Sequence, residues 1–139
     1  MNKIEFFNHL PEEAKAIRFK VFVDEQGFQN ELDAIDDTAI HLVLSVDGTP
    51  AGAARMFTED GGKSYHLGRI CVLKEYRGMH LGADIVNKMC EKAKELGAER
   101  CELSAQCRAM EFYKKIGFQE RGEVYLDEYC PHIFMEKSL

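Results

Sequence analysis

A strand, a short glycine-containing loop and a long helix follow one another in the middle of the chain, and they constrain the fold more than any other part. Residues 64–73 are largely apolar and predict a strand, and residues 82–96 carry an apolar stripe at helical spacing. Residues 100–105 predict the next strand. A strand, a helix and a strand in succession imply two parallel strands joined by a right-handed crossover, which is typical of an α/β domain.

The loop between this strand and this helix is basic and contains Gly78 and Gly82. A strand, a loop and a helix in this order place backbone N–H groups and the positive end of a helix dipole around a phosphate. Arg77 adds a full charge beside such a group. The alternative is an ordinary tight turn. The loop is not a Walker loop, because no Gly-Lys-Ser/Thr follows, and it lacks the Gly-x-Gly-x-x-Gly spacing of the Rossmann fingerprint.

Apolar and alternating runs on both sides of this centre predict further strands and helices. Five more strands are predicted, over residues 4–7, 38–46, 51–58, 118–123 and 133–136. Two more helices are predicted, over residues 11–23 and 108–116. Asp47-Gly48 is a two-residue hairpin signal, and residues 125–131 are interpreted as a loop. The sum is an α/β domain with a mixed, mostly antiparallel sheet.

The segment of residues 24–37 is acidic, contains one glycine and shows no sustained period, which predicts a loop. One interpretation is a solvated connection between elements. The other is a wall of a binding pocket whose carboxylates attract an ammonium group. Asp33, Asp36 and Asp37 do not match the spacing of an EF-hand, so no metal site is expected.

The bulk properties predict one globular domain that spans residues 1–139, with 45% hydrophobic and 30% charged residues. The sequence contains no run of roughly eighteen apolar residues, so no membrane span is expected. The N-terminus lacks the apolar run of a signal peptide, so a cytoplasmic location is expected. The net charge of −6 argues against general nucleic-acid binding, and the five cysteines are expected to be reduced.

The central loop, together with residues 112–118, resembles the GNAT superfamily of acetyl-CoA-dependent N-acetyltransferases. That family carries Gln/Arg-x-x-Gly-x-Gly/Ala between a central strand and a helix, and the matching residues here are Arg77, His80 and Gly82. His80 therefore stands where the family has its middle glycine. If that position needs a positive φ, a histidine there costs roughly 1–3 kcal/mol of strain.

Several further segments resemble a small bacterial subgroup of this superfamily, the ElaA/YjcF-like proteins. The matching segments are residues 21–27, Asp33, Asp36, His41, residues 105–106, residues 131–133 and Met135. The resemblance thus covers nearly the whole chain. It implies a six- or seven-stranded sheet flanked by helices and splayed apart after the central strand, with the coenzyme lying in the split.

The resemblance implies direct transfer of an acetyl group from acetyl-CoA to a primary amine of a small molecule or an amino sugar, without a metal. A protein N-terminus or a lysine is a less favoured acceptor. One alternative is a non-catalytic acyl-CoA sensor or interaction domain on the same fold. Another is acyl transfer to a different kind of acceptor. The sequence allows a homodimer but does not determine the oligomeric state.

Acetyl transfer needs a base, because free alkylamines are mostly protonated at pH 7, and it needs an acid for the leaving thiolate. By resemblance Tyr113 is the acid, with a plain core tyrosine as the alternative. Glu25 and His132 are the candidate bases, and solvent is the third possibility. Ser104 and Gln106 are candidates to face the acceptor, although Ser104 is as well explained by packing.

The coenzyme is expected, again by resemblance, to lie along the central strand and the loop that follows it. The pantetheine arm and the thioester oxyanion would contact the backbone around Ile70, Cys71 and Val72. The pyrophosphate would contact Arg77, Gly78, Met79, His80, Leu81 and Gly82. Cys71 is a less favoured candidate for a covalent nucleophile, because a cysteine within an apolar strand is more often inert.

Overall fold

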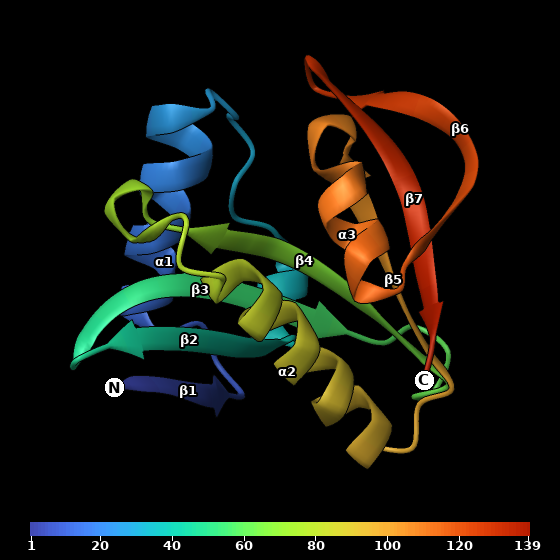
Figure 1. Ribbon diagram of the computed structural model, residues 1–139, viewed down its shortest axis with the longest axis horizontal. Coiled ribbons are helices and arrows are strands. Elements are labelled where there is room, and N and C mark those ends of the chain that lie inside the picture. Colours follow the sequence, from blue (N-terminus) through green and yellow to red (C-terminus); the bar gives the residue numbers. More distant parts are fainter.

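A seven-stranded mixed sheet with helices on both faces makes up the computed structural model, which describes residues 1–139 (Figure 1). The strands lie in the order β1-β2-β3-β4-β5-β7-β6. Their bounds are β1 Asn2–Phe7, β2 Ile40–Val46, β3 Thr49–Phe57, β4 Ser64–Val72, β5 Arg100–Gln106, β6 Gln119–Asp127 and β7 Cys130–Ser138. The expected α/β class and mostly antiparallel sheet are confirmed, because only β4 and β5 pair in parallel.

Three α-helices and four shorter helical segments connect the strands. The α-helices are α1 Glu12–Arg18, α2 Leu81–Glu95 and α3 Met110–Ile116. A π-helical segment, Phe19–Glu25, continues α1, so the first helical region ends two residues later than predicted. The 3-10 turns are Ala34–Asp37, Lys74–Tyr76 and Cys107–Ala109. No helix has the length and hydropathy needed to cross a membrane.

Successive side chains of a strand point to opposite sides of the sheet, so the apolar strands present two apolar faces. Helices α1 and α2 cover one face each. On one face Leu42, Leu44 and Ala54 pack with the buried residues of α2 in the larger core cluster. On the other face Val43 and Ala53 pack against Ala14, Ile17 and Val21, which follow the helical period of α1 and its extension. The two cores hold the sheet between α1 behind and α2 in front (Figure 1).

The sheet opens between β4 and β5. Their parallel pairing runs only from Ser64 with Arg100 to Leu67 with Leu103, and the remainder of each strand has no partner across this gap. β4 also bulges: Ala53 of β3 lies opposite Cys71, and Arg55 lies opposite Gly68, so β4 carries one extra residue. This opening, called here the β4–β5 split, leaves backbone groups of both strands free, as the resemblance implied.

One predicted element is wrong. Residues 125–131 were expected to form a loop, but β6 and β7 extend through them, with Tyr125 opposite His132 and Asp127 opposite Cys130. Only Glu128 and Tyr129 make the turn, and Glu128 adopts φ +56°. Pro131 suggested a loop, yet it lies beyond the end of the β5–β7 ladder, where its missing N–H removes no bond to β5.

Candidate active site

A cavity of about 530 Å³ opens at the β4–β5 split. The segment after α1 and strand β4 line one side of it, including Phe22, Gln26, Phe28, Arg69 and Ile70. Strand β5, helix α3 and the β6–β7 hairpin line the other side, including Ser104, Gln106, Arg108, Tyr113 and His132. Apolar walls with a few convergent polar groups are typical of a small-molecule site.

The loop of residues 77–82 lies outside this cavity, at the beginning of α2, and presents backbone N–H groups. The Asp84 N–H bonds to the His80 carbonyl at 3.2 Å, so the N–H groups of residues 81–83 have no partner within the helix. Gly78 has φ +82° and His80 has φ +62°. Free N–H groups at the positive end of a 15-residue helix make a favourable position for a phosphate.

Side chains around this loop leave its backbone accessible. A Cβ atom at Gly82 would lie 3.3 Å from the Phe112 ring, so the glycine lets the start of α2 approach α3 closely. Leu81 is buried in the core, whereas Met79 is 49% exposed. These residues therefore offer a ligand their backbone more than their side chains.

Tyr113 reaches the cavity from α3 and is almost completely buried. Its ring packs edge-on against Phe112 and Phe118, at centroid distances of 5.0 and 5.9 Å. Burial raises the pKa of the Tyr113 phenol above its ordinary value, because the charged phenolate would lose its hydration. The phenol is therefore protonated at neutral pH and can donate a proton or a hydrogen bond.

His132 lies on the cavity wall in β7, with only 6% of its surface exposed. Its Nδ1 is 2.9 Å from the Cys130 carbonyl oxygen, which can only accept, so Nδ1 carries the hydrogen. Nε2 is then the ring nitrogen that can accept a proton. Tyr125 stacks on the imidazole at 6.1 Å and holds its orientation. The ring is thus built as a proton acceptor.

Comparison with known proteins identifies the family of this chain. Residues 8–139 match the model of the acetyltransferase (GNAT) domain. The chain belongs to the GNAT acetyltransferase family. It is similar to the uncharacterized N-acetyltransferase YjcF of Bacillus subtilis, with 37% identity over 126 residues and 88% of each chain covered. The ElaA/YjcF-like assignment is confirmed, and the protein is an acyltransferase of this family.

Solved structures show the same GNAT fold. Escherichia coli ElaA is 25% identical, with a TM-score of 0.87 and 99% of each chain covered. The N-acetylglutamate synthase of Neisseria gonorrhoeae, complexed with coenzyme A and N-acetyl-glutamate, is 18% identical with a TM-score of 0.73. That match covers 99% of this chain and 35% of the synthase, and it shows the fold alone.

Glu25, a candidate base of this GNAT domain, is bound by Arg77 through both carboxylate oxygens. Arg77 Nη1 lies 2.5 Å from Oε2, and Nη2 lies 2.8 Å from Oε1. The hydrogen bonds from Arg77 lower the pKa of the Glu25 carboxyl, and Glu25 does not line the cavity. Arg77 Nε also donates to the Val72 carbonyl at 3.0 Å. The pair therefore joins the segment after α1 to the 77–82 loop.

The predicted coenzyme residues of β4 differ in their surroundings. Ile70 lines the cavity, and Val72 uses its carbonyl to hold Arg77. Cys71 instead packs into the smaller core cluster, on the α1 side of the sheet. Burial raises the pKa of its thiol to about 12, so the thiol is protonated at neutral pH and is a poor nucleophile.

Ser104 and Gln106, the residues predicted to face an acceptor, both line the cavity from β5. The Ser104 hydroxyl hydrogen-bonds the Tyr125 hydroxyl across the β5–β7–β6 part of the sheet. Gln106 Nε2 donates to the Gln26 side-chain oxygen at 2.8 Å and so connects the two sides of the cavity. Both side chains are thus held in fixed orientations.

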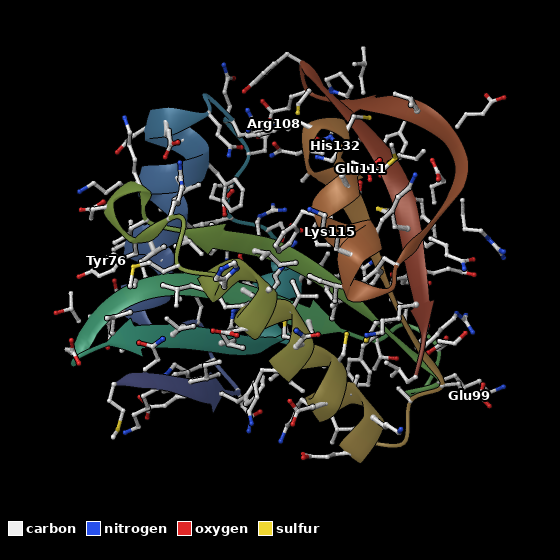
Figure 2. The ribbon with its side chains drawn as sticks, in the orientation of Figure 1. Tyr76, Glu99, Arg108, Glu111, Lys115 and His132 are labelled. Carbon is white, nitrogen blue, oxygen red and sulfur yellow. The ribbon has the colours of Figure 1, made fainter.

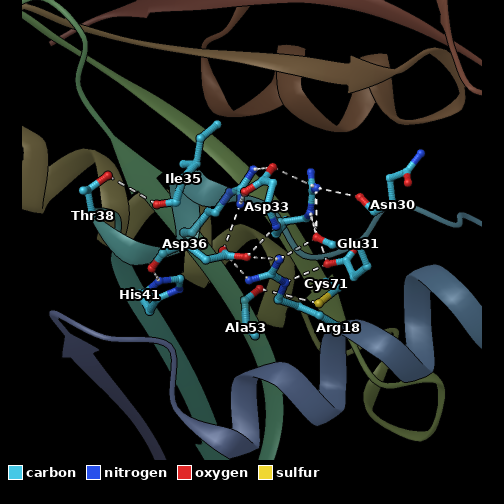
Figure 3. A network of polar contacts seen from close by, with 12 residues as sticks. Arg18, Asn30, Glu31, Asp33, Ile35, Asp36, Thr38, His41, Ala53 and Cys71 are labelled. Carbon is cyan, nitrogen blue, oxygen red and sulfur yellow. Dashed lines mark hydrogen bonds and ion pairs between the residues drawn. The ribbon is translucent and has the colours of Figure 1, made fainter.

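A network of buried ion pairs, with Glu31 and Arg55 on the cavity wall, was not predicted from the sequence (Figure 3). Arg18, 1% exposed, donates from Nε to Glu31 at 2.7 Å and from Nη1 to Asp36 at 2.7 Å. Arg55 donates to Asp33 and Asp36 at 2.6 and 2.9 Å. Burial acts to raise the pKa of Asp36, but the hydrogen bonds from the two arginines outweigh it and hold the pKa at about 2.

Residues 24–37 do form part of the cavity wall, as one of the two interpretations held, but the network corrects what both said of the carboxylates. Glu31 and Asp36 are not solvated, since they are 4% and 6% exposed. Their carboxylates, with that of Asp33, bind arginines of the chain and are not free to attract an ammonium group. A usable signal was present in the sequence: Arg18 falls on the apolar face of α1, and Arg55 interrupts an apolar strand.

We expect His80→Gly to raise the free energy of unfolding by about 1 kcal/mol, because a left-handed residue with a Cβ atom costs about 1–2 kcal/mol relative to glycine. Urea denaturation of both proteins measures the difference. Met79→Gly is the matched control: Met79 has a negative φ, so this substitution is expected to give no gain. Equal or lower stability of His80→Gly would show that His80 is not strained.

Proposed function

We propose that this protein transfers an acetyl group from acetyl-CoA directly to a primary amine of a small molecule or an amino sugar. The observation that carries the proposal is the cavity at the β4–β5 split, with a proton donor and a proton acceptor on one wall. Next to it, the 77–82 loop offers backbone N–H groups for the pyrophosphate of the coenzyme.

In the proposed reaction the acceptor amine attacks the thioester carbonyl carbon while His132 Nε2 takes the amine proton. Backbone N–H groups of β4 around Cys71 and Val72, beyond the end of its pairing with β5, stabilise the oxyanion. The C–S bond then breaks, and Tyr113 gives its proton to the leaving thiolate. Glu25 is the weaker candidate for the base, because Arg77 occupies both oxygens of its carboxylate.

A second candidate is a non-catalytic acyl-CoA sensor on the same fold. The left-handed His80 in the 77–82 loop favours it, because the imidazole stands where the family places a glycine beside the pyrophosphate. Such a sensor would bind acyl-CoA but release no thiol when amines are added.

A thermal-shift titration with acetyl-CoA, CoA and ATP, followed by thiol release with an amine library, tests both candidates. Acetyl-CoA at about 100 times its dissociation constant is expected to stabilise the protein by about 2.7 kcal/mol, and ATP by much less. Stabilisation with thiol release supports the enzyme, and stabilisation without it supports the sensor. If neither acetyl-CoA nor CoA stabilises the protein, both candidates are wrong.

A further inference from the structure

One arginine of the chain lacks a carboxylate partner, and it lies at the cavity. The other six form ion pairs with aspartate or glutamate: Arg18, Arg55, Arg69, Arg77, Arg100 and Arg121. Arg108 forms no such pair, and it lines the cavity on the same side as His132. Figure 2 labels Arg108 and His132 at the same end of α3. A guanidinium without a counter-ion beside a binding cavity points to an anionic ligand.

The Arg108 side chain is held in place by hydrogen bonds that span the cavity. Its Nε donates to the Gln106 side-chain oxygen at 2.8 Å. Gln106 in turn donates from Nε2 to Gln26, on the opposite side, at 2.8 Å. These hydrogen bonds use only Nε of the Arg108 guanidinium. Both Nη atoms therefore remain available for a two-point contact with a carboxylate.

None of the three carboxylates of the cavity wall forms an ion pair with Arg108. Glu31 binds Arg18 and Arg69. Glu128 accepts the backbone N–H groups of Gln29 and Asn30 at 3.2 and 3.3 Å. Asp127 is the wall carboxylate without an ion pair or a hydrogen bond to a backbone amide. The wall thus carries one cation, Arg108, and two carboxylates, Asp127 and Glu128, that form no ion pair, so a zwitterionic ligand would meet charges of both signs.

We propose that the acceptor is an amine that also carries a carboxylate, as in an amino acid, and that Arg108 binds that carboxylate. This inference rests on the proposed function. The acceptor's ammonium group approaches the side of the cavity that holds Asp127 and His132, where it loses its proton. The phosphates of the coenzyme are the other source of anionic groups, but no residue of the 77–82 loop lines this cavity.

Steady-state kinetics with free amino acids and their carboxamides test the proposal, because each pair differs only in the carboxylate. We expect the wild-type protein to use the preferred amino acid at least about 10-fold more efficiently than its amide. Arg108→Gln should raise the KM for that amino acid by about 10- to 100-fold and change neither the KM for its amide nor that for acetyl-CoA. Arg121→Gln, at an exposed ion pair on β6, is the matched control and should change none of these values.

Calorimetric binding of the same acids and amides to the CoA-bound protein gives a readout that needs no turnover. We expect tighter binding of an acid than of its amide, and loss of that preference in Arg108→Gln. No preference for acids in either measurement overturns the proposal. So does an Arg108→Gln variant that loses affinity for acetyl-CoA alone, since Arg108 would then bind the coenzyme. Failure of the proposed function is recognised separately, because the protein would then either not bind acetyl-CoA or bind it without releasing thiol when any amine is added.

Discussion

Tyr113→Phe is expected to lower kcat by about 100-fold or more, with the dissociation constant of acetyl-CoA changed less than about twofold. General acid catalysis contributes about 10²–10⁴ to a rate, and phenylalanine has no proton to give to the thiolate. The ring itself keeps its contacts with Phe112 and Phe118, so binding and stability should be conserved. Thiol release under saturating substrates measures kcat, and calorimetry with acetyl-CoA measures affinity.

Tyr65→Phe is the matched control, because Tyr65 is a partly buried tyrosine of β4 outside the cavity. It should leave kcat unchanged. A Tyr113→Phe variant with wild-type turnover would remove Tyr113 from the mechanism while leaving the coenzyme site intact.

The same assay tests the base. His132→Gln removes the Nε2 lone pair and is expected to lower kcat more than Glu25→Gln, whose carboxylate is already bound by Arg77. The opposite order of effects would assign the base to Glu25. Equal and small effects would leave proton removal to solvent.

Arg18→Met is expected to lower the free energy of unfolding by about 3 kcal/mol, because the buried carboxylates of Glu31 and Asp36 each lose one of their two arginine partners. Methionine keeps much of the side-chain volume, so the loss reports on charge more than on packing. Denaturant unfolding at pH 7 measures it. Arg121→Met, at an exposed ion pair, is the control and should stay within about 1 kcal/mol of the wild type.

The pH dependence of this loss follows from Asp36. Its folded pKa of about 2 lies below the value of about 3.9 in an unfolded chain, so its stabilising contribution is present above pH 4 and is lost as the pH falls toward 2. The difference between wild type and Arg18→Met should therefore shrink on acidification below about pH 4. A difference that stays constant would show that packing, and not charge, causes the destabilisation.

Local sequence patterns predicted most of the fold. The helix of residues 82–96 was predicted within one residue of α2 at each end, because its apolar stripe is long and Gly97 follows it. The Asp47-Gly48 turn was found at the tip of the β2–β3 hairpin, with φ +50° and +85°. The tip of the β6–β7 hairpin was missed, because a proline such as Pro131 usually indicates a loop. Here Pro131 lies beyond the last residue pair of β5 and β7, so its missing N–H removes no hydrogen bond to β5.

The sequence by itself determined the strand–loop–helix–strand order around the 77–82 loop, the resemblance to the GNAT family, and the identity of the candidate acid and bases. The order of elements follows from periodicity, whereas the candidate acid and bases come from short segments that resemble the motifs of the family; both are local properties of the chain. Only the tertiary structure decided which charges meet: Arg77 with Glu25, Arg18 with Glu31 and Asp36, and Arg108 with no carboxylate. Partners 13 to 52 residues apart along the chain are brought together by the sheet order, and no local pattern encodes that order.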